Sequence, residues 1–224
     1  MNSNYIFFLK IGNKLSERIE SNTEKKLNYI THGIGLILSI IGFYYLLSRT
    51  YNIESPDKLF SSVVYGLSLI IMYSSSTLYH YFIDTRFSSA LQKMDHISIY
   101  LLIAGSYTPG LILKLQYSLG LEIFFIIWLT TLIGIIHKIF FFKYYQKISL
   151  FIYLVMGWLI VIDFGAIVES FSNYSIILMV SGGIFYTLGT IFYAQDKLRY
   201  NHVIWHIFVM AGSACHFFMI SSII

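Results

Sequence analysis

Two histidines four residues apart stand in NHVIWHIFVMAGSACH, residues 201–216, a segment that is otherwise almost entirely apolar. On a helix, residues i and i+4 lie on one face about 6 Å apart along the axis, so His202 and His206 could hold one zinc ion at about 2.0–2.1 Å each. His216 lies about 15 Å beyond His206 along the same helix and cannot reach that ion. A catalytic zinc usually has a third protein ligand, which must come from elsewhere in the chain.

His80, in SSSTLYH, is the candidate third ligand, because it ends an apolar stretch at the depth where the segment of His202 begins. Ser76 is four residues earlier on the same helical face and could hydrogen-bond a bound water or the outer nitrogen of a ligand. Asp95, in MDHISIYLLIAGSYTP, begins the next apolar stretch, where an ionisable group is costly and is a functional candidate by default. Asp95 could hold the water and act as general base or acid.

Each of these residues also has an interpretation without chemistry. A single H-x3-H pair is weakly specific, and histidines near helix ends often lie in the polar interface. Asp95 could cap the N-terminus of its helix. The zinc-protease pattern H-E-x-x-H is absent because Val203 occupies the glutamate position, so a base must come from another segment.

The composition indicates an integral membrane protein. Of the 224 residues, 57% are hydrophobic and 12% are charged, against about 25% charged in soluble domains. The mean hydropathy is +0.69. A soluble domain of this size could not bury so much apolar surface. The single cysteine, Cys215, excludes a disulfide within the chain and a cysteine-based metal cage.

Seven stretches reach the length of about 20 apolar residues that a membrane span needs. They are Asn28–Leu47, Leu59–Phe82, Met94–Leu113, Leu119–Phe141, Ile148–Val168, Tyr174–Ala194 and His202–Ile220. We therefore predict an all-α bundle of seven transmembrane helices over residues 28–224. Residues 1–27 are predicted to form a cytoplasmic N-terminal segment. An interfacial helix there could use Ile6, Leu9, Ile11, Leu15 and Ile19, although a solvated tail fits as well.

The positive charges predict the orientation, because short cytoplasmic loops are rich in Lys and Arg. Twelve fall on the side of the N-terminus: Lys10, Lys14, Arg18, Lys25, Lys26, Arg86, Lys93, Lys138, Lys143, Lys147, Lys197 and Arg199. Three, Arg49, Lys58 and Lys114, fall on the other side. We expect a cytoplasmic N-terminus and an external C-terminus. The net charge of +4 is mainly this topology signal, so it requires no nucleic-acid partner.

Together these motifs resemble the hemolysin III family, within the broader progestin and adipoQ receptor family that includes the adiponectin receptors. The resemblance covers nearly the whole chain from Glu24. It rests on EKKLNYITHGIG, on the S-x3-H of Ser76 and His80, on DHISIYLLIAGSYTP, and on H-x3-H followed by a later histidine. The motifs are specific as an ordered set on seven spans, although no single one is.

The resemblance implies a multi-pass protein of the bacterial cell membrane that holds zinc through His80, His202 and His206. It implies that Asp95 orients or activates water, with Ser76 beside it. The adiponectin receptors are similar to ceramide-cleaving amidases, which suggests a zinc-dependent hydrolase of amide or ester bonds in a membrane lipid. Two alternatives stay open, because a fold does not fix a function. One is a membrane-damaging hemolysin, and the other is a receptor or lipid-homeostasis sensor with structural zinc.

Other polar residues have weaker interpretations. Glu24 and Asn28, one helical turn apart, could support the first helix or the cytoplasmic mouth, or simply cap that helix. Three histidines could extend a polar network around the site: His32, His96 and His137. We expect His216 to make a hydrogen bond deep between helices and Asp163 to pair with a neighbouring helix.

Overall fold

The computed structural model of the chain describes residues 18, 20–51, 55–142 and 146–224, and every regular element in these ranges is helical. The helices are α2 (Asn22–Thr50), α3 (Pro56–Tyr81), α4 (Ser88–Leu113), α5 (Gly120–Phe141), α6 (Gln146–Trp158), the 3-10 helix η1 (Leu159–Asp163), α7 (Phe164–Ser170), α8 (Asn173–Tyr193) and α9 (Asn201–Ile223).

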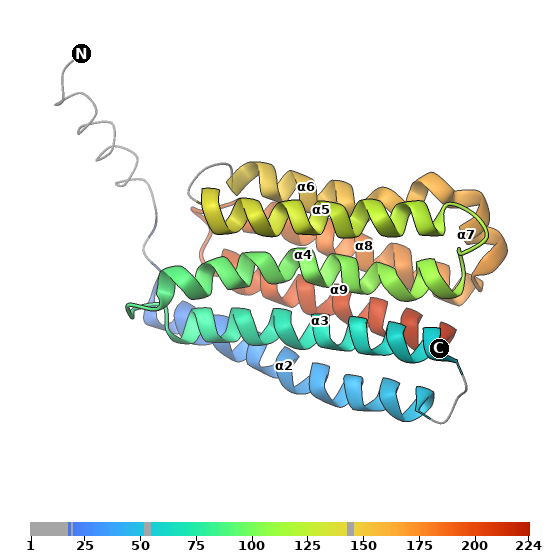
Figure 1. The fold of residues 1–224 in the computed structure, drawn as a ribbon. Helices are drawn as coiled ribbons and strands as arrows, with labels where there is room; N and C mark the ends of the chain where they lie inside the picture. The colour runs from blue at the N-terminus through green and yellow to red at the C-terminus, as the bar shows by residue number, and fades with distance from the viewer. Residues whose placement is uncertain (1–17, 19, 52–54, 143–145) are drawn as a thin grey trace, which may run out of the picture.

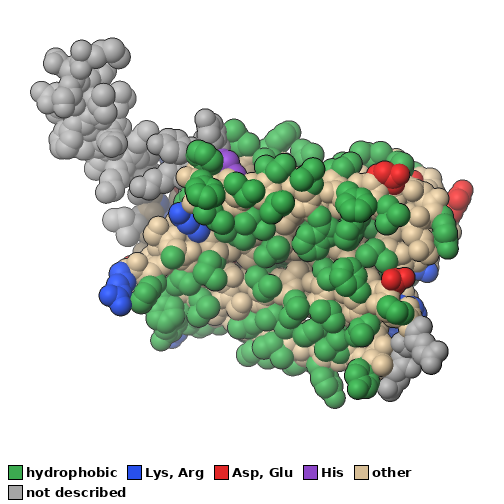
Figure 2. Space-filling view, in the orientation of Figure 1, with side chains coloured by type: hydrophobic (Ala, Val, Ile, Leu, Met, Phe, Trp, Pro, Cys, Tyr) green, Lys and Arg blue, Asp and Glu red, His purple; other side chains and the backbone are tan. Residues whose placement is uncertain are grey.

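Seven described segments are long and apolar enough to cross a membrane, which confirms the predicted fold class. Six are single helices, and the fifth, Ile148–Ser170, combines α6, η1 and α7. Hydrophobic side chains cover the middle of the visible face, and the charged side chains lie toward its two ends (Figure 2). This distribution is that of a multi-pass membrane protein.

Helices α4 and α9 occupy the middle of the bundle (Figure 1). α9 packs against α2, α4 and α8, whereas α4 packs against α3, α5, α6 and α9. At one end of the bundle, α3 and α5 finish while α4 and α9 begin. We call this the inner end; the charge pattern predicts that it faces the cytoplasm.

The first span begins at Asn22, six residues before the expected Asn28. A capping box explains the early start: the Ser21 side chain accepts a hydrogen bond from the Glu24 backbone, and the Glu24 side chain accepts one from Ser21 N at 2.8 Å. Helix capping by Glu24 is thereby confirmed. The interfacial helix considered for Ile6 to Ile19 lies outside the described residues.

The third span also begins earlier than the expected Met94, since α4 starts at Ser88. Asp95 consequently lies about two turns inside the helix. A residue there cannot cap the free N–H groups of the first turn, so the capping interpretation of Asp95 was wrong.

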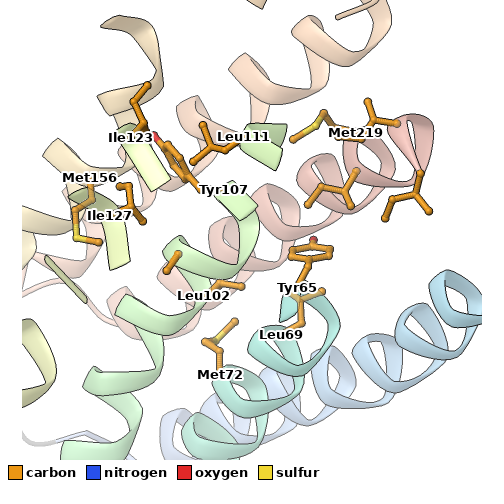
Figure 3. Packing of buried hydrophobic residues seen from close by; sticks show 14 of the residues in the cluster. Tyr65, Leu69, Met72, Leu102, Tyr107, Leu111, Ile123, Ile127, Met156 and Met219 are labelled. Atoms are coloured by element: carbon orange, nitrogen blue, oxygen red, sulfur yellow. The ribbon is translucent and has the colours of Figure 1, made fainter. Parts of the chain in front are cut away.

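Small side chains let α3 approach its neighbours closely. Tyr65, Leu69 and Met72 of α3 pack beside Leu102 of α4 in the interior (Figure 3). A Cβ atom on Gly105 would lie 2.2 Å from Ser68 Oγ, so the glycine is required for this contact between α3 and α4. The glycine thus lets the middle of α4 lie directly against the middle of α3.

The fifth span is interrupted by η1, and Tyr107 of α4 bonds to backbone groups at this irregular turn. The Tyr107 hydroxyl accepts from Ile160 N at 3.2 Å and donates to Gly157 O at 2.9 Å. Backbone groups freed by an irregular turn inside a membrane must find such partners. The hydropathy pattern predicted one continuous fifth helix and gave no sign of this turn.

Candidate metal centre

Three histidines converge at the inner end of the bundle. His80 stands in the last turn of α3, and His202 and His206 stand in the first two turns of α9. Their ring centroids are 4.5 to 5.0 Å apart, and the Nε2 atoms of His80 and His202 are 3.1 Å apart. One ligand nitrogen from each ring lies within 4.8 Å of the others, so the group could hold a metal ion.

The donor set fits zinc. Zinc binds imidazole nitrogens at about 2.0–2.1 Å, and two nitrogens bound to one tetrahedral ion lie roughly 3.3 Å apart. The separation of 3.1 Å between the His80 and His202 nitrogens is close to that value. His80 and His206 are 3% and 1% exposed, so a bound ion would be held away from bulk water.

The side of His206 that faces away from the other two histidines is held by α2. Its Nδ1 lies 3.2 Å from the carbonyl oxygen of Asn28 and 3.1 Å from the Thr31 hydroxyl. A carbonyl only accepts hydrogen bonds, so Nδ1 carries the ring proton and Nε2 keeps the lone pair that a metal needs. His32 stacks on the same ring, with centroids 3.5 Å apart.

Glu24 fixes the place where α9 begins. Its carboxylate accepts a hydrogen bond of 2.7 Å from Tyr200 N, two residues before His202, and forms a salt bridge of 2.6 Å with Arg18. Tyr200 has a left-handed backbone with φ of 60°, which is strained for a residue with a side chain. The buried carboxylate therefore stabilises an unusual turn that sets the position of the histidine pair.

The polar face of α2 thus supports the site through Glu24, Asn28, Thr31 and His32, which follow helical spacing. Glu24, Asn28 and His32 were candidates for a supporting role. Thr31 was missed, and only its position one turn after Asn28 could have indicated it. Just outside this helix, burial raises the pKa of Glu20, whose carboxylate is 3.5 Å from Asn28 Nδ2.

Ser76 and Asp95 meet beside the histidines, from α3 and α4. Ser76 is 1% exposed and lies one turn before His80. Its hydroxyl interacts with the Asp95 carboxylate. Among the described residues, the group that could hold a metal ion consists of His80, His202 and His206, and Asp95 is not part of it. The structure thus places Asp95 near the candidate ligands but outside their group.

The remaining histidines lie apart from this group. His216 Nε2 is 3.4 Å from Met179 O on α8, which confirms the predicted hydrogen bond deep between helices. His96 faces Lys138 of α5, and His137 lies on α5 with its ring 5.9 Å from that of Phe141. Asp163 accepts hydrogen bonds from Ser118 Oγ and Leu119 N, so its partner is the segment before α5.

The fold and the site define a class: a seven-helix membrane protein with a buried histidine centre at one end. The family model described as haemolysin-III related matches residues 20–217. The chain belongs to this family.

Individual relatives agree with the family assignment. The chain is 42% identical to the hemolysin-3 homolog of Bacillus subtilis over 197 residues, which cover 88% of this chain and 92% of that protein. It is 39% identical to hemolysin-3 of Bacillus cereus over 207 residues, covering 92% and 94%. The human monocyte to macrophage differentiation factor is 30% identical over 206 residues, covering 88% and 83%. The human match extends the likeness to the broader receptor-like superfamily.

Proposed function

We propose that the chain is a zinc-dependent intramembrane hydrolase of lipid amide or ester bonds, with His80, His202 and His206 as the zinc ligands. The observation that carries the proposal is the convergence of these histidines beside the Ser76–Asp95 pair. Three neutral imidazoles with one free coordination position are typical of catalytic zinc. When bound, zinc would supply a Lewis acid that polarises a carbonyl and makes water more acidic.

The roles of the protein groups follow from their chemistry. The Asp95 carboxylate holds a water molecule and takes one of its protons as the water oxygen bonds to the carbonyl carbon. The Ser76 hydroxyl keeps the carboxylate oriented. Asp95 then returns the proton to the nitrogen or oxygen that leaves as the acyl bond breaks, giving a carboxylic acid and an amine or alcohol.

A lipid substrate suits the surroundings of the site. The candidate ligands lie within the membrane-spanning segments α3 and α9, so membrane lipids would surround this part of the bundle.

The test is hydrolysis by the purified full-length protein in lipid nanodiscs with zinc, using a fluorescent ceramide and a fluorescent diacylglycerol. We expect turnover by the wild type and loss of turnover with a chelator. Asp95→Asn should lower kcat by about 10²- to 10⁴-fold while zinc stays bound, since it removes the proton carrier alone. His137→Gln is the matched histidine control and should keep full activity. Zinc-loaded wild type that cleaves neither lipid would exclude the hydrolase.

Two other functions have an observation in their favour. The Bacillus relatives are named hemolysin-3 and hemolysin-3 homolog, which favours membrane damage. Lysis of red cells that persists in His80→Ala would support that function. The centre also ties α2, α3 and α9 together, as a structural metal in a sensor would. In that case zinc removal should lower the melting temperature although no lipid is cleaved.

A further inference from the structure

His206 is held at one edge by α2, and a further residue of the same helix covers the face of its ring. The contacts of Nδ1 with Asn28 O and the Thr31 hydroxyl all meet a single atom of the ring. They set the tautomer, but they leave the plane of the ring free to tilt about that atom. His32 lies flat against the ring, with centroids 3.5 Å apart and an angle of 17° between the planes. This stack fixes the plane of the ring and with it the direction in which Nε2 points.

His32 is itself placed by Tyr73 of α3. The two rings meet edge to face, with centroids 5.1 Å apart and an angle of 86° between the planes. Each of the two side chains is only 3% exposed, so neither ring has solvent to move into. Among the described residues, neither ring nitrogen of His32 has a hydrogen-bond partner. Ring contacts therefore hold His32, and its position depends on that of Tyr73.

Tyr73 in turn lies directly against a glycine of α2. A Cβ atom on Gly35 would lie 2.4 Å from Tyr73 Cε1, which is closer than two nonbonded carbon atoms approach. Tyr73 can occupy this place only because position 35 has no side chain. Gly35, Tyr73 and His32 thus form a column of direct contacts, and the column ends on the face of the His206 ring.

We propose that Tyr73 and His32 are positioning residues for the metal centre, because together they hold the ring of His206 in the plane that directs Nε2 at the ion. Both act through His206. The orientation of a metal-bound imidazole affects how well it binds, and a densely packed interior passes the displacement of one ring to the next. The inference rests on the proposed binding of a metal by the three histidines and does not depend on lipid hydrolysis.

The test is titration of the metal-free, full-length protein in detergent with Co²⁺, whose visible absorption bands report the geometry of its ligands. Gly35→Ala should weaken Co²⁺ binding about tenfold and alter the bands, since outer partners of metal-bound histidines contribute 10- to 100-fold to affinity. Gly33→Ala is the matched control on the same helix. Its Cβ would lie 3.8 Å from Thr77 Cγ2, an ordinary contact, so this variant should bind Co²⁺ as the wild type does.

Gly66→Ala separates an effect on the metal centre from a general loss of stability. Its Cβ would lie 2.1 Å from Phe43 Cδ2, so it creates a comparable clash between α3 and α2. Gly66 is about 21 Å from His80 along α3. We therefore expect a lower melting temperature for this variant, together with the Co²⁺ affinity and absorption bands of the wild type.

His32→Leu tests the column at its last member. The substitution removes the flat ring and also two buried nitrogens that have no partner among the described residues. Because unpaired buried polar atoms cost free energy, the metal-free variant should melt at or above the wild-type temperature. Its Co²⁺ affinity should nevertheless fall about tenfold. A residue with a structural role alone would lower the melting temperature and leave the absorption bands unchanged.

The inference is overturned if either Gly35→Ala or His32→Leu shows the Co²⁺ affinity and bands of the wild type, or if Gly66→Ala alters them as much as Gly35→Ala does. A wild type that binds no Co²⁺ would refute the proposed metal centre and this inference with it. A wild type that binds Co²⁺ and cleaves no lipid would refute the hydrolase alone, and the changes in the variants would still support the positioning role.

Discussion

The Nδ1 atom of His206 lies 3.2 Å from the backbone carbonyl oxygen of Asn28, so the first helix fixes the tautomer of a candidate ligand on the last helix. The same nitrogen is 3.1 Å from the Thr31 hydroxyl. Because that hydroxyl donates its own proton to Leu27 O at 2.9 Å, its oxygen accepts the hydrogen bond from the Nδ1 proton of His206. The tautomer is thus held by two acceptors from one turn of α2.

Thr31→Val removes one of these two acceptors and keeps the shape of the side chain. Outer partners of metal-bound histidines usually contribute 10- to 100-fold to affinity, and here Asn28 O remains, so we expect a loss of about tenfold in zinc affinity. Competition with a fluorescent chelator measures it. Thr130→Val is the control, because among the described residues Thr130 bonds to Ile126 O alone, on an exposed face of α5. Equal affinities for Thr31→Val and wild type would show that Asn28 alone fixes the tautomer.

Glu24→Gln removes the charge that joins Arg18, Ser21 and the strained Tyr200 turn. A hydrogen bond to a charged group contributes about 1.5–3 kcal/mol, so we expect a drop of that order in the free energy of unfolding, together with weaker zinc binding. Thermal unfolding with and without zinc measures both effects. Asp84→Asn breaks the exposed pair with Lys25 and should cost about 1 kcal/mol or less. If the two variants unfold alike, the Glu24 network does not anchor α9.

Gly182→Ala tests the packing of His216. An added Cβ would lie 2.2 Å from His216 Cδ2, so the ring must move and lose its bond to Met179 O. We expect a loss of about 1–3 kcal/mol in the free energy of unfolding, with unchanged zinc content, because His216 lies far along α9 from the candidate ligands. Gly165→Ala, whose Cβ would meet no atom within 4 Å, should be nearly neutral. If Gly182→Ala lost zinc, the packing around His216 would not be independent of the histidine centre, contrary to this prediction.

Glu20 gives a pH prediction with a definite sign. Burial raises its pKa above the usual 4.5, so the folded chain holds this proton to higher pH than the unfolded chain does. The contribution of Glu20 to stability is therefore complete below pH 4.5 and falls as pH rises from there through the folded pKa. Glu20→Gln should remove this part of the decline, so the variant should melt above the wild type at neutral pH and not at pH 4. A Glu20→Gln variant that melts below the wild type at neutral pH would contradict the predicted direction of the effect.

Hydropathy and spacing predicted much of this structure. The seven spans follow from runs of apolar residues, since a helix of about 20 predominantly apolar residues can cross a membrane. His80, His202 and His206 were grouped because helix ends at one depth meet in a compact bundle. The spacing of four within α9 then placed two of the rings on one face.

Features that depend on neighbouring helices were not predictable from local sequence. Lys138 counted as a loop charge because hydropathy cannot show that it is buried inside α5 beside His96 of α4. Thr31 drew no attention, because its contact with His206 joins residues 175 positions apart. The turn at η1 depends on a hydroxyl supplied by Tyr107 of another helix. In each case the decisive partner is distant in sequence.

The central claim is that His80, His202 and His206 bind zinc together. Elemental analysis of purified wild type and of His80→Ala tests it most directly, with His137→Gln as the control that removes a histidine outside the group. The account predicts about one zinc per chain in wild type and control, and a large loss in His80→Ala, because two ligands on α9 alone hold the ion weakly. Wild type without zinc, or His80→Ala with as much zinc as wild type, would contradict it.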